Sequence, residues 1–471
     1  MDKLFLPSHY KAELPLIENA SKLIPIFITS KIEDLVGFLA KEQLSFASNV
    51  GFFDQGCKKV ILSDYQGMVS AILLSDEKDL LFKNGSELTT LPPGEYYIAG
   101  EVSEALALET VMGFCFQYYS FDNYVSKKRK CEVKLCFPKN LQKLKIYSFL
   151  ESEFFVRDLI NSPSNFLNPD MFENIISSFC KEQKLELNSI VGNDLIVNNF
   201  PLIFEVGKAS SYNPRLLEFS WGNPNATKVT LVGKGVCFDS GGLNIKPGSS
   251  MSIMKKDMGG AASVLGLASM IISMHLNVRL RVIIPIVENS IAGNSFRPGD
   301  ILKSRKGSTV EVNNTDAEGR LILADALNYA DEESPDLLIS MATLTGSARV
   351  ALGPEIVPFY TTSKMFSDFL IKGGEDSFDP LWQMPFYEPY ERLIEPNFAD
   401  LDNAPATGMA GSITAALFLK KFTENAKIFS HFDIYGWSLI EKPGRQIGGL
   451  MQGSRAIFEA INQMLLKHKN F

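Results

Sequence analysis

The stretch that decides the fold is TLVGKGVCFDSGGLNIKPGSSMSIMKKDMGGAA, which runs from Thr230 to Ala262. It begins with apolar residues typical of a strand, passes through a loop rich in glycine and serine, and ends in small residues that favour a tightly packed helix. A strand, a glycine-rich loop and a helix in this order are typical of a doubly wound α/β layer. The loop carries most of the charge of the stretch, on Lys234, Asp239, Lys246, Lys255, Lys256 and Asp257.

Strand and helix patterns continue to alternate beyond this stretch. This alternation predicts a mainly parallel sheet covered by helices on both faces. Ligands of such sheets bind at the carboxyl ends of the strands, and the polar loops of this chain follow its strands. We therefore expect the functional site at that edge of the sheet. The predicted strands are Val229–Val232, Arg281–Val287, Thr309–Val312 and Asp336–Ala342, and the predicted helices are Gly259–Met274, Leu321–Asp331 and Gly411–Phe422.

Residues 1–150 are predicted to form a smaller α/β domain without chemistry of its own, because they contain no cluster of carboxylates or histidines. Residues 151–471 are predicted to form the larger, catalytic α/β domain. The segment NSPSNFLNP, residues 161–169, interrupts two helical runs and predicts a connection between the domains or an entry to the second one. Within the first domain we expect strands at Leu23–Ile28, Lys58–Ser63, Val69–Leu74, Tyr96–Ala99 and Glu132–Phe137, and a helix at Ser103–Tyr119.

Composition excludes several classes of protein. The 471 residues suffice for two or three domains, and the net charge of −8 argues against a nucleic-acid partner, which would require a basic face. No apolar run reaches the ~20 residues that span a bilayer. The N-terminal sequence MDKLFLPSHYKAELPL lacks the features of a signal peptide. These observations predict a cytoplasmic protein without membrane contact.

The cysteines and histidines limit the kind of metal site. Six cysteines occur without a CxxC spacing, which predicts reduced thiols in a reducing compartment. The four histidines lie far apart in sequence and form no HExxH motif. Any metal would therefore have to be held by carboxylates.

A second segment, NNTDAEGRL from Asn313 to Leu321, adds Asp316, Glu318 and Arg320 just before a predicted helix. Two loops that follow two strands of one sheet can meet in space. Clustered carboxylates raise one another's pKa unless cations intervene. Nearby lysines can supply part of that charge, and a pair of divalent ions supplies it better. Such a pair also activates water and polarises carbonyl groups.

The segments VGKGVCFDSGGLNIK, MKKDMGGAA and NTDAEGRL resemble the signature sequences of the leucyl aminopeptidase family of dinuclear metallopeptidases. NSPSNFLNP, ATLTGSARVALG and HFDIYG resemble further stretches of that family. The matches follow the family's order and cover roughly residues 151 to 450. NTDAEGRL is by itself highly specific for the family.

The resemblance implies five metal ligands: Lys234, Asp239, Asp257, Asp316 and Glu318. Asp239 and Glu318 would bridge two ions, Lys234 and Asp257 would complete the tighter site, and Asp316 would complete the more exchangeable one. A lysine ligand must bind as a neutral amine, so nearby metal ions would have to depress its pKa. Manganese and zinc both suit these ligands, and magnesium stays open.

The resemblance also implies how the reaction proceeds. Lys246 matches the family's catalytic lysine, which stabilises the developing oxyanion. Arg320 matches an arginine that holds a bicarbonate ion, the general base toward the water activated by the two metals. The free amino group of a peptide would bind one metal and Asp257, which explains the release of single N-terminal residues. General peptide turnover and cleavage of Cys-Gly dipeptides are both open as the physiological role.

The pocket for the first side chain is expected to be lined by Met254, Thr343, Leu344, Gly346 and Tyr435. Here the chain departs from the family, whose usual segment is HxDIAG where this chain reads HFDIYG. Tyr435 replaces a small residue and predicts a narrower or reshaped pocket, which leaves a preference for leucine open. The resemblance further implies a homohexamer.

Simpler interpretations stand beside these. Asp316 and Glu318 could cap the helix that follows them, and Lys255 and Lys256 are expected to be ordinary solvated charges. His431 is expected to be a structural histidine. A dinuclear phosphoesterase is a rival function, but it normally uses histidine ligands. A nucleic-acid-binding regulator with a degenerate site is another rival, which the intact ligand set and the acidic charge oppose.

Overall fold

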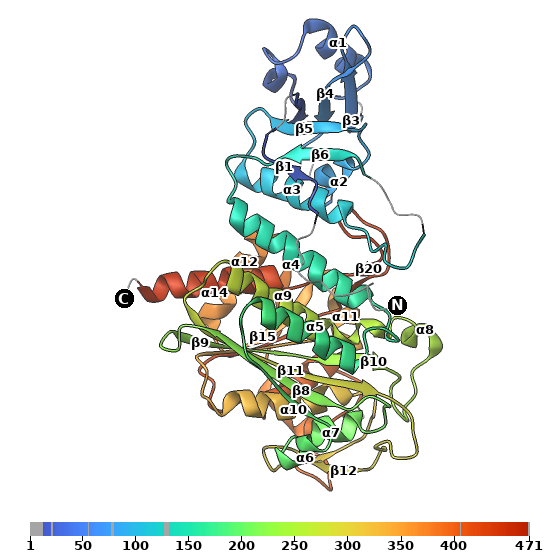
Figure 1. Cartoon of the computed structure of the whole chain (residues 1–471), viewed down its shortest axis with the longest axis vertical. Helices are drawn as coiled ribbons and strands as arrows, with labels where there is room; N and C mark the ends of the chain where they lie inside the picture. The colour runs from blue at the N-terminus through green and yellow to red at the C-terminus, as the bar shows by residue number, and fades with distance from the viewer. Residues whose placement is uncertain are drawn as a thin grey trace. The chain divides into compact units, whose positions relative to one another are not determined.

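The computed structural model describes residues 13–19, 22–54, 56–76, 80–126, 131–405 and 407–469 (Figure 1). These residues form two compact units. The larger unit contains Ser152–Ser438 and residues 448–469, and the smaller one contains residues 13–151 and Leu439–Ile447. The first twelve residues, on which most of the prediction about a signal peptide rests, lie outside the described residues. No described helix is both long enough and apolar enough to span a bilayer.

The smaller unit is built on a six-stranded sheet in which the pairs are parallel except for β3 with β4. The five strands and the helix predicted here are confirmed to within two residues at each end. The sheet order is β1 (Leu16–Ile17), β6 (Val133–Cys136), β5 (Gly94–Ala99), β2 (Ile24–Ile28), β4 (Val69–Leu74) and β3 (Lys59–Ser63). Its helical elements are η1 (Ile32–Leu35), α1 (Lys41–Asn49), α2 (Lys83–Leu88) and α3 (Glu104–Tyr118).

The larger unit contains a mixed sheet with a parallel centre, which confirms the predicted fold class. The central strands β18, β14, β9 and β11 are parallel neighbours, while β15, β8 and β7 join them in antiparallel pairs. The order is β16 (Leu381–Gln383), β15 (Val357–Thr361), β18 (Phe429–Asp433), β14 (Leu337–Ala342), β9 (Thr227–Gly233), β11 (Val278–Asn289), β8 (Arg215–Gly222) and β7 (Leu187–Val191). Short strands lie outside this path: β10 (Gly235–Asp239), β12 (Ile301–Lys303), β13 (Thr309–Glu311), β17 (Leu401–Asp402), β19 (Trp437–Ser438) and β20 (Gly448–Gly449).

Helices cover both faces of this sheet. Figure 1 shows α5 and α9 on one side of the strands and α7 and α10 on the other. The NSPSNFLNP break lies between α4 and α5, whereas the division between the two units falls inside α4. The helical elements are α4 (Lys143–Asn161), α5 (Pro169–Glu182), α6 (Asp194–Val197), α7 (Pro201–Gly207), α8 (Gly248–Met251), η2 (Met254–Met258), α9 (Gly259–Ser273), α10 (Glu318–Asp331), α11 (Gly346–Leu352), α12 (Lys364–Asp376), η3 (Glu388–Ile394), α13 (Gly411–Lys420) and α14 (Ser454–Lys469).

Several boundaries differ from the sequence predictions by a few residues, and two of these differences matter for the site. Residues 235–239 were predicted as loop but form strand β10, which pairs in parallel with β11. Gly235 permits this because a Cβ there would lie 2.6 Å from the carbonyl oxygen of Pro285. Helix α10 begins at Glu318, so Glu318 and Arg320 belong to its first turn instead of preceding it.

The start of helix α9 lies directly against the sheet, because glycines leave no side chain between them. A Cβ at Gly260 would be 2.2 Å from the carbonyl oxygen of Met341 in β14. The amide of Ala261 donates to the carbonyl of Lys234, at 2.9 Å. The short helix η2 ends where α9 begins, so this contact also sets the position of Asp257.

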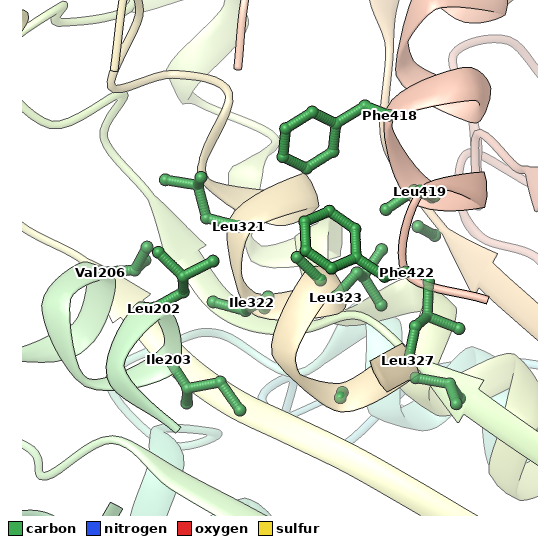
Figure 2. Close-up of a cluster of buried hydrophobic side chains, with 14 of the residues drawn as sticks. Leu202, Ile203, Val206, Leu321, Ile322, Leu323, Leu327, Phe418, Leu419 and Phe422 are labelled. Carbon is green, nitrogen blue, oxygen red and sulfur yellow. The ribbon is translucent and has the colours of Figure 1, made fainter. Parts of the chain in front are cut away.

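Helix α10 is buried along nearly its whole length, because the sheet covers one side of it and α7 and α13 cover others. Figure 2 shows the resulting cluster, in which Leu321, Ile322, Leu323 and Leu327 of α10 lie among side chains from the two other helices. This packing holds the first turn of α10, with its charged residues, in place. The other labelled side chains are Leu202, Ile203, Val206, Phe418, Leu419 and Phe422.

A buried carboxyl group joins α10 to α7. Asp325 accepts hydrogen bonds from the amides of Leu202 and Ile203 at the start of α7, at 2.7 and 3.4 Å, and from the amide of Arg305 at 2.8 Å. It thereby satisfies amides that the N-cap residue Phe200 leaves without a side-chain acceptor.

Burial raises the pKa of Asp325 from 3.8 to about 7, although these three amides favour its charged form. Between those two values the folded state holds more protons than the unfolded state. The contribution of Asp325 to stability is therefore greatest below pH 3.8 and is lost as the pH rises toward 7.

Candidate metal centre

The candidate residues gather where the central strands end. Lys234 follows β9, Asp239 ends β10, and Thr343 follows β14. Asp257 lies in η2, while Glu318 and Arg320 lie in the first turn of α10. This is the edge of the sheet at which the sequence predicted a site.

Lys234 lies among carboxylates inside the protein. Its Nζ is 2.8 Å from Asp257 Oδ2 and 2.9 Å from Glu318 Oε1, and it donates to the carbonyl of Thr343 at 3.0 Å. Burial opposes the charge on Lys234, but Asp257, Glu318 and Asp239 outweigh it and raise the pKa of this lysine. Thr343 Oγ1 in turn donates to Asp257 Oδ1 at 2.7 Å, which fixes that carboxylate.

Lys246 bridges the two other carboxylates. Its Nζ is 2.8 Å from Asp239 Oδ2 and also pairs with Asp316 Oδ1. Burial disfavours its charge, but the surrounding carboxylates, Asp239 first, raise its pKa. One cation therefore contacts both segments that the sequence analysis singled out.

The three carboxylates Asp239, Asp316 and Glu318 each place an oxygen within 4.8 Å of the others. Burial, followed by repulsion from Asp239, raises the pKa of Glu318 to about 8 and that of Asp316 to about 6. Such shifts are expected where carboxylates crowd together with too little positive charge.

The carboxylate oxygens of this cluster are suitable ligands for divalent cations. In the described part of the chain, Asp257 Oδ2, Asp316 Oδ1 and both Glu318 oxygens are buried without a well-oriented hydrogen-bond donor, although lysine ammonium groups lie within ion-pair distance of three of them. Buried carboxylate oxygens need a partner to offset their desolvation. Hard divalent ions prefer such oxygens as ligands.

Two residues that the sequence analysis did not single out hold the loops together. Asn289, at the end of β11, donates to Asp239 Oδ1 at 2.8 Å and to the carbonyl of Thr315 at 3.0 Å. Thr315 Oγ1 donates to the carbonyl of Gly241. These contacts join the segment of Asp239 to the segment of Asp316. Asn289 lies outside every quoted motif, and Thr315 lies inside NNTDAEGRL but carries no charge that would mark it as a ligand.

Arg320 is also buried, and its Nε and Nη1 atoms have no acceptor among the described residues. Burial lowers the pKa of its guanidinium to about 10, although Asp433 opposes the change. The group is therefore still a cation at neutral pH, with donors available to an anion.

These residues line a cavity of about 350 Å³, within the usual range for small-ligand sites. The predicted pocket residues Met254, Thr343, Leu344, Gly346 and Tyr435 line the same cavity. The lining also includes the predicted ligands and catalytic residues Lys234, Asp239, Lys246, Asp257, Asp316 and Arg320. Glu318 is not part of this lining, but it forms an ion pair with Lys234, which is.

The prediction that Lys256 is a solvated charge is wrong. Its side chain is buried and lines the cavity, with 4% of the residue exposed. Burial lowers the pKa of Lys256 to about 8.

Lys255 is partly buried and donates to the carbonyl of Asn161 at 2.7 Å. His431 is buried with Nδ1 3.2 Å from Ser340 Oγ, as expected of a structural histidine.

A sheet with a parallel centre and with buried carboxylates and lysines at the carboxyl edge of its central strands fits the class of metal-dependent hydrolases. Residues 154–457 match the catalytic domain of the cytosol aminopeptidase family. A probable cytosol aminopeptidase of Sulfurihydrogenibium sp. is 35% identical over 413 residues, which cover 85% of this chain and 80% of that protein. The cytosol aminopeptidase of Encephalitozoon cuniculi is 36% identical over 71% of this chain and 70% of its own length.

Solved structures agree with the sequence matches. The cytosol aminopeptidase of Coxiella burnetii superposes with a TM-score of 0.90 at 37% identity, over 95% of this chain and 99% of that one. A bottromycin maturation enzyme, solved in complex with Mn, gives a TM-score of 0.83 at 26% identity, over 94% of this chain and all of the other. This chain belongs to the leucyl, or cytosol, aminopeptidase family and is a metallo-aminopeptidase.

Proposed function

We propose that this enzyme releases single N-terminal amino acids from peptides by means of a water molecule activated by two divalent ions, and that it serves peptide turnover in the cytoplasm. The observation that carries the proposal is the cluster of carboxylates on Asp239, Asp316 and Glu318, each of which offers one oxygen within 4.8 Å of the others. The family match and the manganese complex of a structural relative support it.

The proposed ligands are Lys234, Asp239, Asp257, Asp316 and Glu318, with manganese or zinc as the ions. The family resemblance assigns Asp239 and Glu318 as ligands common to both ions, and the two residues, from different segments, belong to the same carboxylate cluster. Lys234 must lose a proton to ligate, since the carboxylates around it otherwise keep it charged. Bound here, two divalent ions would lower the pKa of a shared water and polarise the scissile carbonyl.

The remaining steps belong to side chains of this chain. Asp257 would accept a hydrogen bond from the free amino group of the peptide, which selects the first peptide bond. Lys246 Nζ would donate to the carbonyl oxygen as negative charge develops on it. Arg320 would hold bicarbonate through its two unpartnered nitrogens, and a bound bicarbonate would supply a general base beside the attacking water.

The first side chain of the substrate is proposed to enter the part of the cavity lined by Met254, Thr343, Leu344, Gly346 and Tyr435. Tyr435 is 8% exposed, and its ring occupies space that a small residue would leave open. We propose that this ring reshapes the pocket. Residues 1–150 are proposed to form a non-catalytic domain, residues 151–471 the catalytic one, and the assembly a homohexamer.

The test combines metal content with a substrate profile. Purified protein loaded with manganese or zinc is expected to hold two metal ions per chain by mass spectrometry. It should cleave leucine p-nitroanilide but neither the N-acetylated form nor p-nitrophenyl phosphate. Glu318→Gln and Asp316→Asn should lose metal and activity, while Asp368→Asn, an exposed carboxylate on α12, should keep both. A Glu318→Gln variant with two metal ions and full activity would contradict the proposal.

A further inference from the structure

The cavity contains a buried cation that the proposed mechanism does not use. Lys256 lies in η2, one residue before Asp257, with 4% of the residue exposed. Its Nζ lies 4.8 Å from the centre of the Tyr435 ring. Among the described residues Lys256 has neither an ion pair nor a hydrogen bond to its ammonium group. A buried ammonium without a counterion is costly, so its retention requires an explanation.

A second cation contacts the same aromatic ring. The guanidinium carbon of Arg349, in α11, lies 4.6 Å from the centre of the Tyr435 ring. Arg349 has no carboxylate partner within the described part of the chain, and it lines the same cavity. Repulsion from Arg349 is one of the effects that disfavour the charge on Lys256. The ring faces of tyrosine attract cations, but a ring carries no net charge with which to neutralise two of them.

The acidic groups nearby are already engaged. Asp257 is paired with Lys234 and accepts a hydrogen bond from Thr343 Oγ1. Asp433 accepts hydrogen bonds from the amides of Leu344 and Thr345 and from the hydroxyls of Thr345 and Ser412. Within the described part of the chain, neither of these two carboxylates forms an ion pair with Lys256 or Arg349, so each is committed to other partners.

On this basis we infer that Lys256 and Arg349 form an anion-binding subsite that receives the side-chain carboxylate of an N-terminal glutamate or aspartate. The inference rests on the proposed function, because it places the first side chain of the peptide beside Tyr435. Peptide side chains of this charge are carboxylates, and a guanidinium and an ammonium are the groups that bind them. Lys256 and Arg349 are then specificity-determining residues of an aminopeptidase for acidic N-termini.

The experiment compares glutamate and glutamine p-nitroanilides, which differ in charge but hardly in shape. Manganese-loaded wild type is expected to show a kcat/KM at least about tenfold higher for glutamate. Lys256→Met should lower the glutamate-to-glutamine ratio by ~10- to 100-fold, the effect of losing one charged hydrogen-bond partner. Lys255→Met removes the same charge at the neighbouring position, outside the cavity lining, and should leave the ratio unchanged.

Arg349→Gln provides an independent variant, because this residue is exposed on α11 and its guanidinium contacts the Tyr435 ring from the cavity side. It should lower the same ratio even if Lys256→Met fails to fold. Equal cleavage of glutamate and glutamine substrates by wild type, alongside cleavage of leucine or alanine substrates, would overturn this inference and leave the proposed function standing. Absence of cleavage of every aminoacyl substrate would instead overturn both.

A final comparison tests which carboxylate is bound. Ala-Ala and Ala-Ala-amide differ only in the C-terminal carboxylate of a dipeptide. Equal turnover of the two supports an acidic first residue as the ligand. A preference for the free acid that disappears in Lys256→Met would place the carboxylate on the second residue and overturn the inference.

Discussion

The contact of α9 with β14 predicts that Gly260→Ala disturbs both stability and catalysis. The added Cβ would lie 2.2 Å from the carbonyl oxygen of Met341 and 2.8 Å from Cα of Ala342. Both neighbours belong to the backbone of a central strand, so no side chain can rotate away. The helix and the strand must separate by roughly 1 Å to reach an ordinary contact distance.

The magnitude follows from two opposing terms. Replacing glycine by alanine in a helix interior favours folding by up to ~1 kcal/mol. Overpacking a core contact costs about 1–3 kcal/mol, and the upper end applies where only backbone can yield. We expect a net loss near 2 kcal/mol, which corresponds to a fall in Tm of about 5 °C for a unit of this size.

Activity should fall as well, because η2 and Asp257 directly precede the displaced turn. A displacement near 1 Å at a catalytic group can cost ~10²-fold in rate. Thermal unfolding followed by circular dichroism measures the first effect, and kcat/KM on leucine p-nitroanilide with manganese measures the second.

Gly259→Ala is the matched control for stability. Its Cβ would meet side-chain atoms only, Thr343 Cγ2 at 3.2 Å and Ile160 Cδ1 at 3.6 Å. Because these side chains can shift, we expect a change in unfolding free energy within ~1 kcal/mol. Equal Tm values for Gly260→Ala and Gly259→Ala would refute the argument that the backbone contact at position 260 is what requires glycine.

Two further predictions concern buried charges. Asp325→Asn should remove a pH dependence of stability. The raised pKa of Asp325, about 7, makes the folded state bind a proton that the unfolded state has lost. Between pH 5 and pH 7 the unfolding free energy of wild type should therefore fall more steeply than that of the variant, by up to about 1.4 kcal/mol per pH unit. Urea unfolding at each pH measures this, and parallel pH profiles would rule it out. At constant ionic strength, added bicarbonate is expected to raise the kcat of wild type, and Arg320→Gln should abolish this stimulation. Stimulation that survives in the variant would count against Arg320 as the residue that binds bicarbonate.

Much of the candidate site could be predicted because its residues lie in short motifs next to strands. Lys234, Asp239 and Asp257 come from one continuous segment, and Asp316 and Glu318 come from another. The first segment contains turn glycines at Gly241 and Gly242, and each segment adjoins its own strand or helix. The structure brings the two segments together through Lys246, which pairs with Asp239 and Asp316.

Other features could not be predicted, because they depend on residues remote in sequence. Lys256 looks the same as Lys255 in the sequence, and only the tertiary structure, with the Tyr435 ring beside its ammonium group, reveals a buried cation. Asn289 carries no motif, yet it joins the two segments of the site. The pairing of β10 with β11 was missed because glycines and a cysteine do not form a strand pattern by themselves.

By itself, the sequence determined which side chains can ligate and the order of strands and helices that carries them, since both follow from local patterns of polarity and glycine. Tertiary structure alone decided which charges have partners. Asp325, Lys256 and Arg320 are all charged residues in the sequence, but one caps a distant helix while the other two point donors into a cavity. Burial and the positions of remote neighbours set the cost of each charge, and neither is encoded in the residues adjacent to it.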